Sequence, residues 1–236
     1  MAKRSRRRRE GLGPPPRKAD QVKIPSNGGR AGYRHRGRVV LIGGVVCLAA
    51  AIGIVSAVVL TGPSSTMATP RTIPWGEVPQ LQGGPAPWNS GSATLGERLS
   101  AAGLHELTME GAVVHIHQHL DLFVNGKKTP VPALIGIDPT ANLFTEIHTH
   151  DATGLIHVES PTKTRFTLGQ LFCEWGVKLT PRCLGRYRER ISWWVNGRKM
   201  AGDPAQLVLE PHQEIVIAAG HPPSDVPQSY PFPAGL

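Results

Sequence analysis

A run of 22 residues without a charged side chain divides this chain and limits what its N-terminal part can fold into. The run is VVLIGGVVCLAAAIGIVSAVVL, residues 39–60, in which Ser56 is the only clearly polar residue. An α-helix rises ~1.5 Å per residue, so a helix of this length matches the ~30 Å hydrocarbon core of a bilayer. We therefore expect a single transmembrane helix at 39–60. A cleaved signal peptide is the alternative, because SSTMA at 64–68 contains the small residues found at cleavage sites.

Basic side chains are concentrated directly before the apolar run. Residues 1–38 contain 13 of the 26 Lys and Arg residues and two acidic residues, whereas the rest of the chain has a net charge of −2. The positive-inside rule then predicts a cytoplasmic, disordered tail at 1–38 and an extracytoplasmic location for everything after residue 60. The expected partner of the tail is the lipid bilayer, through its anionic lipids. Nucleic acid is not an expected partner, since the globular part carries no excess of basic charge.

The chain after the apolar run divides by composition into three parts. Residues 61–93 are rich in Pro, Gly and Ser and predict an extended linker. Trp75 and Trp88 are unusual in such a linker, and either pack on the domain or lie at the membrane surface. Residues 221–236 are again rich in Pro and are expected to strap over the surface or to fray. The region between them, 94–220, is long enough for one small extracytoplasmic domain.

Residues 114–124 have the alternation of a half-buried β-strand, with apolar side chains at most even positions. The odd positions place His115, His117 and His119 together on the face turned away from the core. An Asn-Gly pair follows at 125–126, and this dipeptide is the strongest short-range signal for a β-hairpin. The stretch therefore predicts a strand that carries three histidines on its polar face and then turns back.

A second hairpin is predicted over residues 142–160, with DATG at its tip. This turn would set His148 opposite His157 on neighbouring strands. The segment 166–176 has apolar residues at helical spacing, with Thr167 as the expected N-cap and a glycine at its end. These elements predict the main helix of the domain, packed against hairpins.

Further elements complete the expected fold. TLGERLSAAG at 94–103 predicts a short helix, a second Asn-Gly pair at 196–197 predicts a third hairpin, and LVLEPHQEIVIAAG at 207–220 predicts a last strand. The expected fold class is therefore α+β: a β-rich single domain of hairpins with one main helix, preceded by the transmembrane helix.

Two resemblances accompany this reading. The hairpins, helix and closing strand over residues 154–220 resemble the β-grasp arrangement of ubiquitin-like and sulfur-carrier domains. HIHQHLDLFVNGK, HTHDATGLIHVES, FTLGQLFCEWGV and GDPAQLVLEPHQEIVIAAG resemble an uncharacterised family of bacterial membrane-anchored or secreted proteins with H-x-H-x-H, H-T-H-D-x-T-G and H-Q-E-I blocks. The family resemblance implies a domain from about residue 112 to 220 and implies no particular chemistry.

Histidines are the candidate functional residues. Six of the ten lie within 43 residues: His115, His117, His119, His148, His150 and His157. Alternate residues of a strand stand ~6.6 Å apart, so an H-x-H pair can converge on one ion, while the first and third histidines of a straight strand cannot. We expect one H-x-H pair with one or two ligands from the second hairpin. Asp151 or Glu146 would be a further ligand or orient an imidazole, and His212 is a weaker candidate.

Imidazole ligands without a thiolate partner suit Zn²⁺ or Cu²⁺. The sequence therefore predicts a metal-binding domain for capture, storage or delivery. Alternatives are a metal-dependent enzyme of unknown substrate, a metal-free interaction module of the cell envelope, a pH-responsive imidazole cluster, and histidines that are merely polar surface or hydrogen-bonded structure. No G-x-S-x-G motif or Cys/His pattern indicates nucleophilic catalysis.

The cysteines predict a structural role. Cys47 lies within the apolar run and is expected to be a small apolar residue there. Cys173 and Cys183 belong to the extracytoplasmic part, where thiols oxidise, and we expect a disulfide between them. Two buried free thiols are the alternative.

Overall fold

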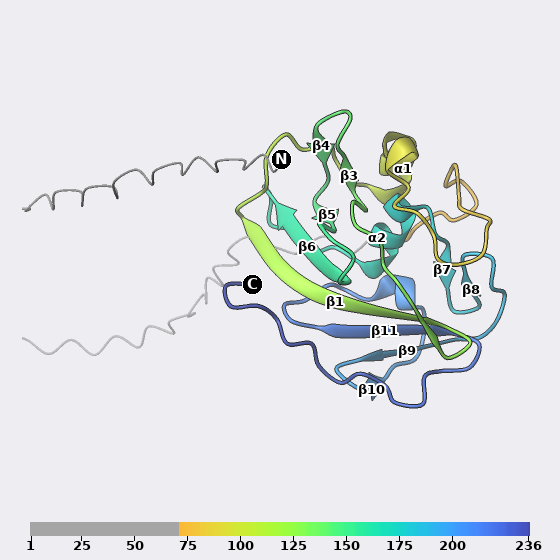
Figure 1. The fold of residues 1–236 in the computed structure, drawn as a ribbon. Helices are drawn as coiled ribbons and strands as arrows, with labels where there is room; N and C mark the ends of the chain where they lie inside the picture. Colours follow the sequence, from red (N-terminus) through yellow and green to blue (C-terminus); the bar gives the residue numbers. More distant parts are fainter. Residues whose placement is uncertain (1–70) are drawn as a thin grey trace, which may run out of the picture. The chain divides into compact units, whose positions relative to one another are not determined.

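The computed structural model describes residues 71–236, so the predicted tail at 1–38 and the predicted membrane helix at 39–60 lie outside the described residues. Residues 71–236 contain a strand-rich α+β domain with one main helix, as the sequence predicts (Figure 1). Over this same range, no helix combines the length and the apolar character needed to cross a membrane.

One seven-stranded sheet organises the domain, in the order β10-β9-β11-β1-β6-β5, with β2 paired to β1. The longest strand, β1, pairs in parallel with β11 and antiparallel with β6. Figure 1 shows β1, β11 and β9 side by side in the sheet. The strands are β1 (Val114–Val124), β2 (Lys127–Thr129), β5 (Ile147–His148), β6 (Leu155–Ser160), β9 (Ile191–Val195), β10 (Arg198–Lys199) and β11 (Glu214–Ala219).

Both Asn-Gly pairs form the predicted hairpin turns. The first joins β1 to β2, with φ of 49° at Asn125 and 75° at Gly126. The second joins β9 to β10, with φ of 50° at Asn196 and 74° at Gly197. Positive φ at both central residues matches the right-handed twist of the flanking strands, and Asn and Gly adopt it at low cost. The two hairpin predictions are therefore confirmed.

The predicted main helix is α2 (Leu168–Trp175). The Thr167 side chain accepts from the backbone N–H of Gln170, and the Gln170 side chain accepts from the backbone N–H of Thr167, which is a complete capping box. The helix ends at Gly176, whose φ of 76° is left-handed. All eight residues of the helix are buried, so α2 forms the centre of the core.

The core lies between α2 and the even-position side chains of β1, together with apolar residues of β6 and β11. Helix α1 (Leu95–Ala102) packs beside α2, which confirms the predicted short helix. The remaining elements are β3 (Ile137–Asp138), β4 (Leu143–Phe144), β7 (Leu179–Thr180), β8 (Cys183–Leu184) and two 3₁₀ turns, η1 (Ser92–Thr94) and η2 (Pro204–Gln206).

The segments that precede and follow the sheet in the chain pack onto the domain. Both linker tryptophans pack on the domain, which is the first of the two placements expected from the sequence. Trp88 is buried and lies edge-to-face against Trp175, with ring centroids 5.9 Å apart. Trp75 is partly buried and contacts the core. At the other end, residues 221–236 strap over the sheet. Within that strap, Tyr230 stacks on His119 at 3.9 Å between ring centroids.

The predicted disulfide is wrong, because Cys173 and Cys183 are both free thiols and both are buried. Cys173 lies within α2, where burial raises the pKa of its thiol to about 12 and keeps it protonated. Cys183 lies in β8, and its thiol donates to the carbonyl oxygen of Gly185 at 3.2 Å. A ten-residue spacing does not fix how two side chains point, and here each thiol fills a separate place in the core.

Candidate metal centre

The histidines gather on the face of the sheet opposite α2. Odd positions of β1 point to this face, whereas even positions enter the core. His117 pairs with His157 across β1 and β6, and His157 pairs with His148 across β6 and β5. Three imidazoles therefore stand in one row across three neighbouring strands, and the predicted pairing of His148 with His157 is confirmed.

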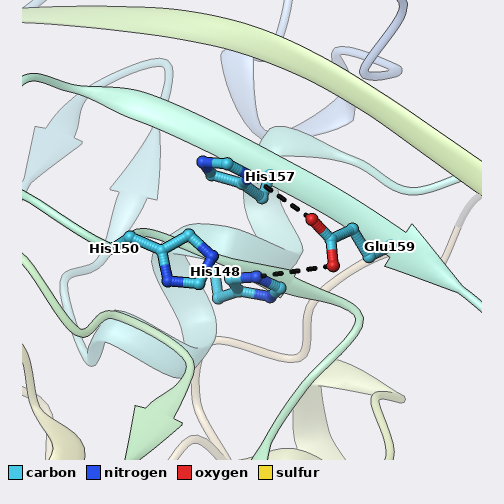
Figure 2. Close-up of side chains that lie close together, drawn as sticks. All are labelled: His148, His150, His157 and Glu159. Atoms are coloured by element: carbon cyan, nitrogen blue, oxygen red, sulfur yellow. Dashed lines mark hydrogen bonds and ion pairs between the residues drawn. The ribbon is translucent and has the colours of Figure 1, made fainter. Parts of the chain in front are cut away.

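Four residues of the second hairpin form what we name the four-ligand group: His148, His150, His157 and Glu159. Each offers a ligand atom within 4.8 Å of those of the others. Figure 2 shows one carboxylate oxygen of Glu159 facing His157 and the other facing His148. The distances are 3.3 Å from Oε1 to His157 Nδ1 and 4.0 Å from Oε2 to His148 Nε2.

A hydrogen bond outside the group orients His148. Its Nδ1 donates to the backbone carbonyl of Thr145 at 3.0 Å, because a carbonyl oxygen can only accept. In the neutral ring, Nε2 then carries the lone pair, and this atom points toward Glu159. Such a bond on the far nitrogen is the usual support of a metal-bound histidine.

The environment keeps three of the imidazoles, those of His117, His148 and His157, uncharged. Burial lowers the pKa of His148 to about 4 and is the main reason that the pKa of His157 falls to about 3, with a further contribution from His150. Burial also lowers the pKa of His117 and raises that of the Glu159 carboxyl. At neutral pH these three histidines are therefore in the form that binds a metal ion.

A second cluster adjoins the first. We name His115, His117 and the shared Glu159 the two-histidine group, whose ligand atoms also lie within 4.8 Å of one another. His115 Nε2 is 3.3 Å from Glu159 Oε1. The ring of His117 contacts the ring of His157, with centroids 4.6 Å apart, so the two groups abut.

His119, the third histidine of β1, lies in a separate cluster with Asp121 and Glu214. Its Nδ1 is 2.7 Å from a carboxylate oxygen of Glu214, and its Nε2 donates to the carbonyl of Thr153 at 2.9 Å. Asp121 is paired with Lys128. Both ring nitrogens of His119 therefore already have hydrogen-bond partners. Its separation from His115 follows from the length of the strand.

The other candidates have partners of their own. Asp151 is exposed and accepts from the backbone N–H and the hydroxyl of Thr153, which closes the hairpin tip; hydrogen bonding lowers its pKa. Glu146 contacts His105 at 2.7 Å. The ring of His212 donates to the carbonyl of Leu236 at 2.9 Å. None of these three candidates is part of the two groups that share Glu159.

Sequence reasoning overlooked Glu159, which both groups share. Its signal was present, because Glu159 follows His157 by two residues on a strand and must therefore project from the same face. The predicted combination of an H-x-H pair with a histidine of the second hairpin also differs from the structure. His115 and His117 meet a carboxylate of that hairpin, and the H-x-H pair of His148 and His150 joins His157.

Comparisons with models of known protein families, with curated proteins and with solved structures found no match. The chemistry of the site therefore rests on its own residues.

Proposed function

We propose that this domain binds a divalent transition metal ion, Zn²⁺ or Cu²⁺, at the four-ligand group. One observation carries the proposal: among the described residues, His148 Nε2 and Glu159 Oε2 are buried and lack a hydrogen-bond partner, yet they face each other at 4.0 Å. A buried polar atom without a partner costs ~1–3 kcal/mol. An ion between these atoms would satisfy both.

The spacing of the ligand atoms supports the same proposal. A tetrahedral ion bound at ~2.0–2.2 Å holds neighbouring ligand atoms ~3.3–3.6 Å apart. The 3.3 Å between His157 Nδ1 and Glu159 Oε1 matches this edge. The 4.0 Å between His148 Nε2 and the other carboxylate oxygen, Oε2, is longer, and a small rotation of the carboxylate would bring one oxygen toward both imidazoles. Three imidazoles and one carboxylate form a donor set that suits Zn²⁺ and Cu²⁺.

Four protein ligands around one ion favour holding over catalysis, because a catalytic ion usually keeps a position open for water. We therefore propose capture, storage or delivery of the ion as the role of the four-ligand group. The basic segment 1–38 and the apolar run 39–60 support anchoring in the membrane, with the domain on the extracytoplasmic side. The quoted sequence blocks support membership of the bacterial membrane-anchored or secreted family described above.

A β-grasp-like arrangement is also proposed for the domain. The order of β6, α2, the β9–β10 hairpin and β11 over residues 154–220 supports it.

The test of metal binding uses the full chain, purified in detergent without a histidine tag. It is loaded with Zn²⁺ or Cu²⁺, freed of excess metal and analysed by elemental mass spectrometry. We expect bound metal in the wild type and its loss from the four-ligand group in His148→Ala. His105→Ala is the matched control, since it removes an imidazole that contacts a glutamate outside the group. Absence of bound metal in the wild type would exclude this function.

A further inference from the structure

We infer that this face holds two metal ions and that Glu159 bridges them, with the second ion at the two-histidine group. The inference rests on the proposed function, because it assumes that the four-ligand group holds the first ion. It adds a second site, a bridging residue and a difference in how firmly the two ions are held.

The shared carboxylate is the first support. Glu159 Oε2 is buried and faces His148, while Oε1 lies 3.3 Å from His115 Nε2 and 3.3 Å from His157 Nδ1. A carboxylate has two oxygens and can bind one ion through each. Oε1 therefore lies between one imidazole of each group, while Oε2 faces His148, so this single carboxylate contacts both groups, as a bridging ligand requires.

An unpartnered nitrogen is the second support. His117 is 4 % exposed, and its Nε2 is buried without a hydrogen-bond partner among the described residues. His117 does not belong to the four-ligand group, so an ion there would leave this nitrogen unsatisfied. An ion held by His115, His117 and Glu159 satisfies it, and 3.3 Å between His115 and Glu159 already fits a tetrahedral edge of ~3.3–3.6 Å.

The contact between the two groups would bring the two ions close together. The rings of His117 and His157 lie 4.6 Å apart between centroids, although each ring belongs to a different group. Two-metal sites in proteins have ions ~3.5–4 Å apart, commonly joined by a shared ligand. Adjacent rings and one common carboxylate are the arrangement that brings two ions to such a separation.

The two ions would differ in lability. The second has three protein ligands, so a tetrahedral ion there keeps one position for water or an external anion. This side of the cluster is also open, because the His115 side chain is 53 % exposed. One carboxylate shared by two divalent ions leaves strong repulsion between them, and we expect the second ion to bind ~10-fold or more weakly than the first.

The experiment measures bound Zn²⁺ per full chain in detergent, by stepwise titration against a chromophoric chelator and by elemental mass spectrometry. We expect two equivalents in the wild type, the second weaker. His115→Ala should retain one tight equivalent, and it is a mild change because the side chain is mostly exposed. His105→Ala should keep two. Loading with Cu²⁺ adds a second readout: two bridged ions should show spin coupling by electron paramagnetic resonance, and His115→Ala should restore the signal of an isolated ion.

Each outcome separates this inference from the proposed function. One equivalent in the wild type, lost in His148→Ala, would overturn the second site and leave the first intact. Two equivalents that persist in His115→Ala, or two uncoupled Cu²⁺ ions, would also overturn it. No bound metal in the wild type would overturn both proposals.

Discussion

The pH dependence of unfolding should reveal how the buried imidazoles are held when no metal is bound. An unfolded chain binds a proton on histidine near pH 6.5, while burial of His148 lowers its pKa to about 4 in the folded domain. Between these values the unfolded state holds a proton that the folded state lacks. Stability contributed by His148 is therefore full above pH 6.5 and decreases as the pH falls toward 4.

The size of this effect follows from the two pKa values. Each pH unit within the window changes the free energy of unfolding by up to ~1.4 kcal/mol per histidine. Lowering the pH from 7 to 5 should therefore cost ~2 kcal/mol through His148 alone. Solvent screens this imidazole little, since the residue is only 1 % exposed.

The assay is urea unfolding of the described domain, residues 71–236, after removal of metal with a chelator. His148→Gln isolates the residue, because glutamine does not titrate. The buried carboxyls Glu159 and Glu174, whose pKa values are raised by burial, act with the opposite sign but are common to both proteins. The wild type should lose ~2 kcal/mol more than His148→Gln between pH 7 and 5. Equal losses in the two proteins would refute the buried, neutral state of His148.

Three further predictions test other parts of the structure. Glu159→Gln should abolish metal binding at both groups without lowering the stability of the metal-free domain, because it removes a buried carboxyl and keeps the shape of the side chain. Metal titration measures the binding and urea unfolding measures the stability. An unchanged metal content would contradict the prediction. Gly154→Ala should destabilise the domain by at least ~1–2 kcal/mol. The reason is that φ at this position is 93° and an added Cβ would lie 2.5 Å from the carbonyl oxygen of Leu120. An unchanged midpoint of urea unfolding would contradict this backbone conformation at Gly154. Addition of a reducing agent should leave the melting temperature unchanged, because Cys173 and Cys183 are free thiols. A lower melting temperature in the reducing agent would instead indicate a disulfide between them.

Local signals in the sequence were enough for the elements that carry the site. The Asn-Gly pairs determined the hairpin turns, and the alternation along β1 placed His115, His117 and His119 on one face. Thr167 and the glycine at 176 correctly bounded α2, because capping depends on neighbouring residues.

Features that depend on tertiary packing were harder to predict. The contact of Glu159 with His115 and His117 depends on the pairing of β1 with β6, which brings its carboxylate between two sets of imidazoles. The assignment of His119 to Glu214 likewise required the parallel pairing of β1 with β11, whose residues are nearly a hundred positions later in the chain. The disulfide prediction failed because cysteine spacing carries no information on side-chain direction.

The measurement that tests the central claim most directly is anomalous X-ray diffraction from crystals of the chain loaded with Zn²⁺, collected on both sides of the zinc absorption edge. The account predicts an anomalous peak ~2.0–2.2 Å from ligand atoms of His148, His150, His157 and Glu159, with His148 bound through Nε2. A peak only beside His119 and Glu214, or no peak on this face of the sheet, would contradict it.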